Sequence, residues 1–94
     1  GDKSVTLYSP ADGYVARVDN TAIKKIARVA GAPIDKGAGV KLHGKVGYKV
    51  KKGDPIITIY AESETKLSYA HTLAMQLKPI TIEGMLLQRI SALE

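Results

Sequence analysis

Alternating apolar and polar residues near the start of the chain predict two short strands. The segment VTLY (residues 5–8) alternates in this way, and so does YVARVD (residues 14–19). Between them, SPADG (residues 9–13) has the composition of a tight turn, because Pro10 presets one backbone dihedral and the Asp-Gly pair tolerates a positive φ. The pattern therefore predicts a β-hairpin.

The period changes to that of a helix over NTAIKKIARVAG (residues 20–31). Asn20 is a favourable N-cap, and Gly31 suits the position just past a helix end. The lysines and the arginine of this segment fall on one side of the helix. The opposite side carries an apolar stripe that consists of Ile23, Ile26, Ala27 and Ala30.

The next segment, GAPIDKGAG (residues 31–39), contains three glycines and invites comparison with phosphate-binding loops. It follows a helix and leads into a strand, which is the reverse of the strand-to-helix order of such loops. Its glycine spacing also matches neither phosphate-binding motif. We therefore expect an ordinary connection here rather than a phosphate site.

Three further strands are predicted in the remainder of the chain. The first is VKLHGKVGYKV (residues 40–50), in which Gly44 and Gly47 indicate a bulge or bend. The second is IITIYA (residues 56–61), which is rich in β-branched residues. A short final strand, ITI, is predicted at residues 80–82.

A second helix is predicted between Ser63, a favourable N-cap, and Pro79, which closes the segment. The order of elements is therefore β-β-α-β-β-α-β, which indicates an α+β domain rather than a parallel α/β sheet. The apolar face of the second helix consists of Leu67, Ala70, Leu73, Ala74 and Leu77.

After the last strand, MLLQRI (residues 85–90) is apolar enough to pack on a neighbouring subunit or on another part of a parent chain.

Length and composition fit one small domain. Ninety-four residues with 45% apolar content are enough for a single core, which we expect over residues 5–78, with residues 79–94 as a C-terminal extension. Because the chain lacks cysteine, neither a disulfide framework nor a thiolate metal site is possible, which fits a cytoplasmic protein. We expect no signal peptide and no membrane helix, since no apolar run approaches the roughly 18 residues that a span needs.

The net charge of +5 is concentrated in the middle of the chain. Residues 24–52 contain nine basic residues against Asp35 alone, a net charge of +8. Such a block is compatible with nucleic acid, an acidic partner surface or a phosphorylated substrate. We favour a solvated lysine face. Because Tyr48 is the only aromatic residue in the block, a stacking platform for single-stranded nucleic acid is not expected.

Residues that carry acid–base or metal chemistry are sparse. The two histidines, His43 and His71, lie in separate elements and lack the spacing of a metal-binding helix, so we expect surface or packing roles. Structural roles in turns, caps and helix starts are expected for Asp12, Asp19, Asp35, Asp54, Glu62 and Glu64. No catalytic, cofactor-binding or metal-binding residue is predicted, and no cofactor is expected in this domain.

The stretch YKVKKGDPIITIYAES (residues 48–63) is typical of swinging-arm carrier domains, in which the hairpin that follows presents a biotinylated or lipoylated lysine. Counted from the Gly-Asp-Pro turn, that lysine should lie near Ser63. Lys66 comes three residues later, within the helical pattern. The attachment residue is therefore absent, and only the scaffold of a carrier remains.

The segments SPADGYVARVD and LHGKVGYKVKKGDPIITIYAE resemble the two halves of a barrel-sandwich hybrid, or α/β-hammerhead-like domain. Together with the helix ending AGAP and the strand entry ID-x-G-A-G-V, they are similar to the C-terminal domain of the thymidine and pyrimidine-nucleoside phosphorylases. The resemblance covers about residues 9–70. Within the family, the chain looks closest to the archaeal branch of thymidine and AMP phosphorylases. The GAGR motif and longer loop of bacterial members are replaced here by the shorter AGAPID.

The resemblance implies a parent enzyme that catalyses reversible phosphorolysis, in which inorganic phosphate attacks the ribosyl anomeric carbon, the base leaves and a sugar 1-phosphate forms. Thymidine, other pyrimidine nucleosides and AMP are the implied substrates. The family's catalytic residues lie in preceding α and α/β domains, so none is carried over to these 94 residues. The chain is then expected to be a non-catalytic accessory domain that acts in cleft closure and in assembly of a homo-oligomer. A carrier module and a basic nucleic-acid-binding domain are the alternatives.

Overall fold

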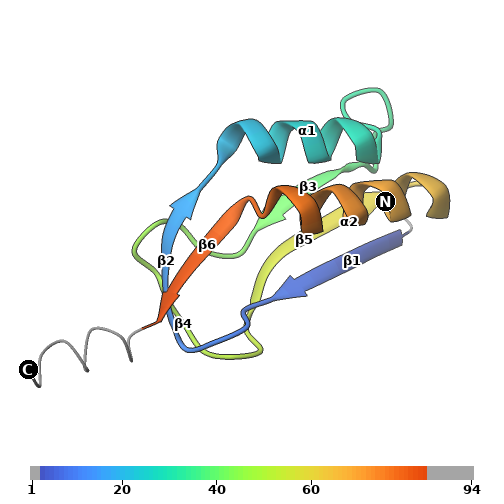
Figure 1. The fold of residues 1–94 in the computed structure, drawn as a ribbon. Helices are drawn as coiled ribbons and strands as arrows, with labels where there is room; N and C mark the ends of the chain where they lie inside the picture. Colours follow the sequence, from blue (N-terminus) through green and yellow to red (C-terminus); the bar gives the residue numbers. More distant parts are fainter. Residues whose placement is uncertain (1–2, 85–94) are drawn as a thin grey trace, which may run out of the picture.

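The computed structural model describes residues 3–84 and contains helices together with antiparallel strands (Figure 1). The predicted α+β class is therefore confirmed. In chain order the elements are β1 (Lys3–Tyr8), β2 (Gly13–Val18), α1 (Asn20–Ala30), β3 (Gly39–Leu42), β4 (Lys49–Val50), β5 (Pro55–Ala61), α2 (Glu64–Leu77) and β6 (Ile80–Gly84).

The strands form two three-stranded antiparallel sheets, in the orders β1-β5-β3 and β4-β2-β6. Both helices cover one face of the first sheet and pack against each other (Figure 1). The second sheet is joined directly to the helices, since β2 leads into α1 and α2 leads into β6.

The predicted hairpin between the first two strands is wrong. β1 pairs with β5, whereas β2 belongs to the other sheet. The turn between them is bound to the turn before β5: the Ser9 N–H donates to the Asp54 carbonyl (2.8 Å), and the Gly53 N–H donates to the Ser9 carbonyl (2.9 Å). Burial explains this pairing, because it places Val5 and Leu7 of β1 against the core.

The segment 40–50, predicted as one strand with a bend, forms two strands in different sheets. β3 pairs with β5, and β4 pairs with β2. The connection between them turns at Gly47, whose φ of 95° favours glycine and whose N–H donates to the Val15 carbonyl (2.8 Å). The predicted bend is therefore confirmed, but the chain crosses between sheets at this point. This crossing accounts for the extra strand relative to the predicted order.

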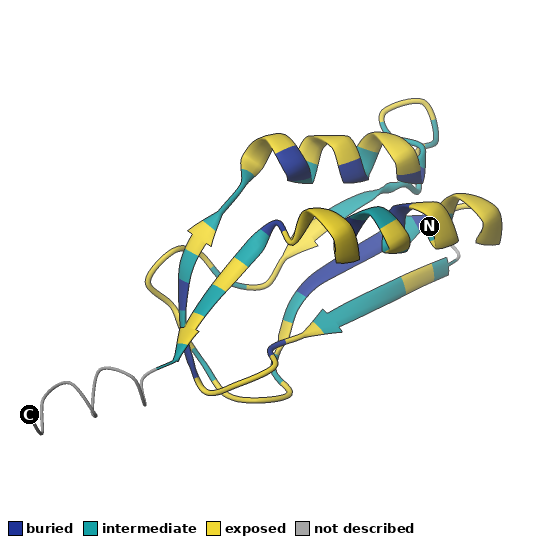
Figure 2. Cartoon of the chain, viewed as in Figure 1, coloured by how far each residue is buried: buried dark blue, intermediate teal, exposed yellow. Residues whose placement is uncertain are grey.

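The core lies between the two helices and the first sheet, where Figure 2 shows buried positions on the inward faces of the helices and along β5. Both helices contribute alanines to the core cluster, and small side chains of this kind suit the packing of α1 on α2. The predicted stripes are largely confirmed, although in α1 Ala22 is buried while Ile23 is half-buried, and Leu77 at the end of α2 is exposed. The central cluster consists of Ile26, Ala30, Ile59, Ala61, Ala70 and Ala74.

Both helices begin at a capping side chain. Ser63 caps α2 as predicted. For α1 the predicted cap is wrong by one residue, because the Asp19 Oδ1 accepts the hydrogen bond of the Ala22 N–H (3.1 Å). Asn20 is instead the first residue of the helix. Asp19 therefore satisfies one of the N–H groups that a helix start leaves without an intrahelical partner.

This assignment can be tested by two neighbouring substitutions. Asp19→Ala is expected to lower the free energy of unfolding by about 1 kcal/mol, because it removes the acceptor at the helix start. Asn20→Ala is the matched control and is expected to change it by less than about 0.5 kcal/mol, because Asn20 is exposed in the first turn. Urea denaturation measures both values. An equal or larger loss for Asn20→Ala would contradict the assignment.

The predicted final strand is confirmed as β6, which pairs with β2 from Val18–Ile80 to Gly13–Gly84. Residues 80–84 are thus part of the second sheet. The predicted apolar segment at residues 85–90 lies outside the described residues. Across residues 3–84, no helix is both long enough and apolar enough to cross a membrane.

Candidate functional site

The two histidines of the chain are not brought together. His43 follows β3, and its Nε2 lies 2.7 Å from the Oγ1 of Thr58, which in turn lies 3.0 Å from the Oγ1 of Thr6. His71 is half-buried on α2. These positions fit the surface and packing roles expected from the sequence. Among residues 3–84, no group of three or more His, Asp or Glu side chains is arranged to hold a metal ion.

Three of the four aspartates for which the sequence predicted structural roles have those roles. The Asp12 Oδ1 accepts from the Lys52 N–H (2.8 Å), and the Asp54 Oδ2 accepts from the Lys51 N–H (2.9 Å). Asp19 caps α1. These carboxylates stabilise the turn before β5 and the start of α1, because each satisfies a backbone N–H.

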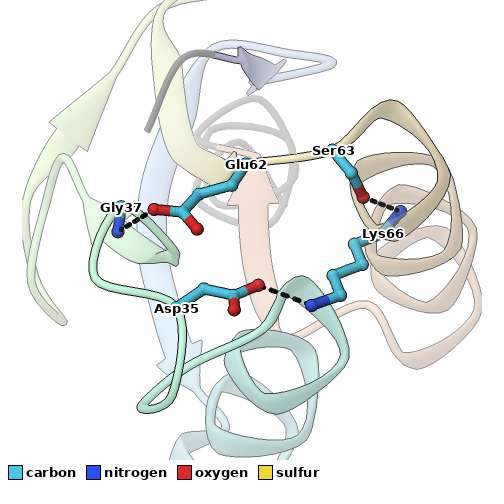
Figure 3. A network of polar contacts seen from close by, with 5 residues as sticks. All are labelled: Asp35, Gly37, Glu62, Ser63 and Lys66. Atoms are coloured by element: carbon cyan, nitrogen blue, oxygen red, sulfur yellow. Dashed lines mark hydrogen bonds and ion pairs between the residues drawn. The ribbon is translucent and has the colours of Figure 1, made fainter.

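The remaining aspartate of these four, Asp35, belongs to a polar network that joins the glycine-rich loop to the start of α2 (Figure 3). Its Oδ2 accepts from the Lys66 Nζ at 2.6 Å, and the Glu62 Oε2 accepts from the Gly37 N–H at 3.1 Å. Lys66 is therefore ion-paired on a helix and is not presented on a hairpin as a carrier lysine would be. Sequence reasoning missed this network, because its partners lie 25 and 31 residues apart and no local pattern joins them.

The same contacts explain the role of the glycine-rich loop at residues 31–39. Gly31 ends α1 with a φ of 123°, as predicted, and its N–H donates to the carbonyls of Ala27 and Arg28 (3.1 Å each). The Gly37 N–H donates to a carboxylate. Both N–H groups are thus occupied within the chain, and the loop connects α1 to β3.

All nine basic residues of the block at 24–52 are exposed. They are distributed over α1, the loop before β3, β3 itself, the β3–β4 connection, β4 and the turn after it. This distribution over several elements agrees with a solvated basic face.

An apolar groove with a volume of about 590 Å³ opens between the two sheets, and the sequence did not predict it. Its walls come from β1, β5, the C-terminal half of α2 and the start of β6. Hereafter it is the intersheet groove. Its apolar lining includes Leu7, Tyr8, Ile57, Ala74, Met75 and Ile80.

The lining of the intersheet groove has the character of an interaction surface. Tyr8 and Met75 are large hydrophobic residues, yet each is 59% exposed. His71 and Lys78 also line the groove, and none of its lining residues is acidic. Contiguous exposed apolar surface next to polar groups is typical of protein–protein contact sites. One sequence signal was available, because Met75 lies off the predicted apolar face of its helix.

The fold is that of a small α+β domain, and the sequence matches the model of one protein family. Residues 14–81 match the family model described as "Pyrimidine nucleoside phosphorylase C-terminal domain". The match covers more than half of the chain, and the chain belongs to this family. The resemblance noted in its motifs is therefore confirmed.

The individual relatives described below are all AMP phosphorylases. The chain is 62% identical over 90 residues to the AMP phosphorylase of Pyrococcus horikoshii and 57% identical over 90 residues to that of Methanosarcina acetivorans. Each alignment covers 96% of this chain and 18% of the relative. The AMP phosphorylase of Pyrococcus furiosus is 58% identical over 93 residues, which cover 99% of this chain and 18% of that protein. The chain thus spans about a fifth of the length of the curated relatives it matches, and neither a carrier nor a nucleic-acid-binding domain is favoured.

Proposed function

We propose that this chain is the non-catalytic C-terminal domain of a phosphorylase that cleaves the N-glycosidic bond of AMP or of a pyrimidine nucleoside such as thymidine. The observation that carries the proposal is the alignment of 96% of this chain with 18% of AMP phosphorylases at 57–62% identity. In the proposed reaction, inorganic phosphate is the co-substrate and attacks the anomeric carbon, and the base leaves as the sugar 1-phosphate forms. The reacting groups then belong to preceding α and α/β domains.

The proposed role of the domain itself is architectural. It packs beside the phosphate-binding domain, limits the opening and closing of the cleft and contributes to a homo-oligomer of the parent enzyme. The packed core and the exposed intersheet groove support this role, because exposed apolar surfaces are used in contacts between domains. We place the parent enzyme in the cytoplasm, where nucleotides and inorganic phosphate occur together.

The proposal is tested in the full-length protein by measuring phosphate-dependent release of base from AMP, thymidine and uridine. His43→Ala is expected to keep kcat/KM within about threefold of the parent enzyme, because the reacting groups are proposed to lie in the preceding domains. Removal of a general acid or base would instead cost about 10²- to 10⁴-fold. A loss of that size for His43→Ala would contradict a non-catalytic domain. Failure to cleave any of the three substrates would overturn the proposed parent activity.

A further inference from the structure

The intersheet groove is bordered by two strands that each have a free edge. β1 pairs with β5 alone, and β6 pairs with β2 alone, within the residues that the structure describes. The lining of the groove includes Thr6, Leu7 and Tyr8 of β1 and Ile80 at the start of β6. An edge strand presents main-chain N–H and C=O groups that another extended segment can pair with, and native proteins usually cover or blunt such edges.

Next to the free edge of β1, the groove provides pockets for apolar side chains. Leu7 and Ile57 come from paired positions of β1 and β5, and Ala74 and Met75 come from α2 above them. Lys78 contributes an ammonium group and His71 an imidazole to the lining, and no lining residue is acidic. An extended segment with apolar side chains and a flanking carboxylate therefore fits both the edge and the lining.

We propose that an extended, apolar and acidic segment from the part of the full-length protein that precedes residue 1 occupies the intersheet groove and adds a strand to the edge of β1. The inference rests on the proposed function, and it names the contact through which the architectural role is exerted. The relatives extend over more than five times the aligned length, and the matched family is a C-terminal domain, so the preceding chain is the largest source of an occupant.

The occupant is identified by site-specific photo-crosslinking in the full-length protein. A benzophenone amino acid replaces Met75 in the groove or, as the matched control, Tyr69 on the same helix. Tyr69 is 65% exposed, close to the 59% of Met75, and does not line the groove. Irradiation followed by peptide mass spectrometry is expected to join position 75 to one stretch upstream of residue 1 in the same molecule, and position 69 is expected not to join that stretch.

Several outcomes would overturn the proposal. Crosslinks from position 75 to residues 85–94 would identify that segment as the occupant. Crosslinks between isotopically light and heavy copies would identify a second subunit, and the absence of any specific crosslink would leave the groove open to solvent. The phosphorolysis assay separates the two proposals: an active enzyme without the upstream crosslink overturns the docking alone, whereas an inactive protein overturns the parent function.

A second measurement reports on strand addition directly. Met75→Glu places a carboxylate on the apolar wall. In the full-length protein it is expected to reduce at least tenfold the hydrogen-exchange protection of those amides in residues 4–8 that point away from β5. Tyr69→Glu, with the same change of charge on the same helix, is expected to leave that protection unchanged. Equal protection in the two variants would contradict pairing along β1.

Discussion

Ile59→Ala is expected to lower the free energy of unfolding by about 2–5 kcal/mol. Ile59 is 0% exposed and lies at the centre of the core cluster, with β1 and β3 on either side of its strand and buried residues of both helices in the same cluster. Truncation removes apolar contacts and leaves a cavity that a rigid sheet cannot close. Urea denaturation should show a lower midpoint with an unchanged m-value, because the surface exposed on unfolding stays nearly the same.

The matched control for this prediction is Ile34→Ala. It removes the same atoms from a side chain that is 89% exposed in the loop after α1. Its expected effect is within about 0.5 kcal/mol, as for surface substitutions in general. If the two variants lost similar amounts of stability, Ile59 could not be the centre of the core.

Gly13→Ala is expected to lower the free energy of unfolding by about 3 kcal/mol, at the upper end of the usual cost of overpacking. A Cβ at this position would overlap the carbonyl oxygen of Glu83 and lie 2.8 Å from its carbonyl carbon. Glu83 belongs to β6, which is hydrogen-bonded to β2 at this point. A backbone group in a ladder cannot rotate away, so the two strands must separate locally.

Gly39→Ala controls for the general effect of replacing a strand glycine. A Cβ at Gly39 would meet no atom within 4 Å, and the residue begins β3 without a positive φ. We expect a change within about 0.5 kcal/mol for this variant. Thermal unfolding of both variants, followed by circular dichroism, tests the difference. Similar midpoints for the two proteins would show that β2 and β6 do not approach as closely as the structure indicates.

Elements that depend on local chemistry were predictable from the sequence. The period of apolar residues located both helices, and Ser63 and Gly31 marked the start of one helix and the end of the other. Asp19 and Asn20 are both good caps, so local sequence alone does not decide between them. The choice has a tertiary cause. The Asp19 N–H donates to the Pro79 carbonyl (2.7 Å), and this contact with the start of β6 holds Asp19 outside the helix.

Strand partners were not predictable in the same way. The Asp12–Gly13 turn is compatible with a hairpin, yet β1 and β2 separate because pairing with β5 buries Val5 and Leu7 on the core. Sequence patterns indicate which residues alternate, but burial against distant elements decides which strand lies next to which. The family resemblance, by contrast, came from several short motifs in a fixed order, and it was confirmed.

The sequence by itself therefore determined the α+β class, the helices, the absence of an attachment lysine near Ser63 and the membership of the phosphorylase C-terminal family. Only the tertiary structure decided the division into two sheets, the Asp35–Lys66 contact and the intersheet groove. The physical reason is the separation along the sequence of the residues that interact. Caps, turns and periodicity depend on residues within a few positions of one another, whereas the groove requires β1, β5, α2 and β6 to meet, and that depends on how the whole chain buries its apolar surface.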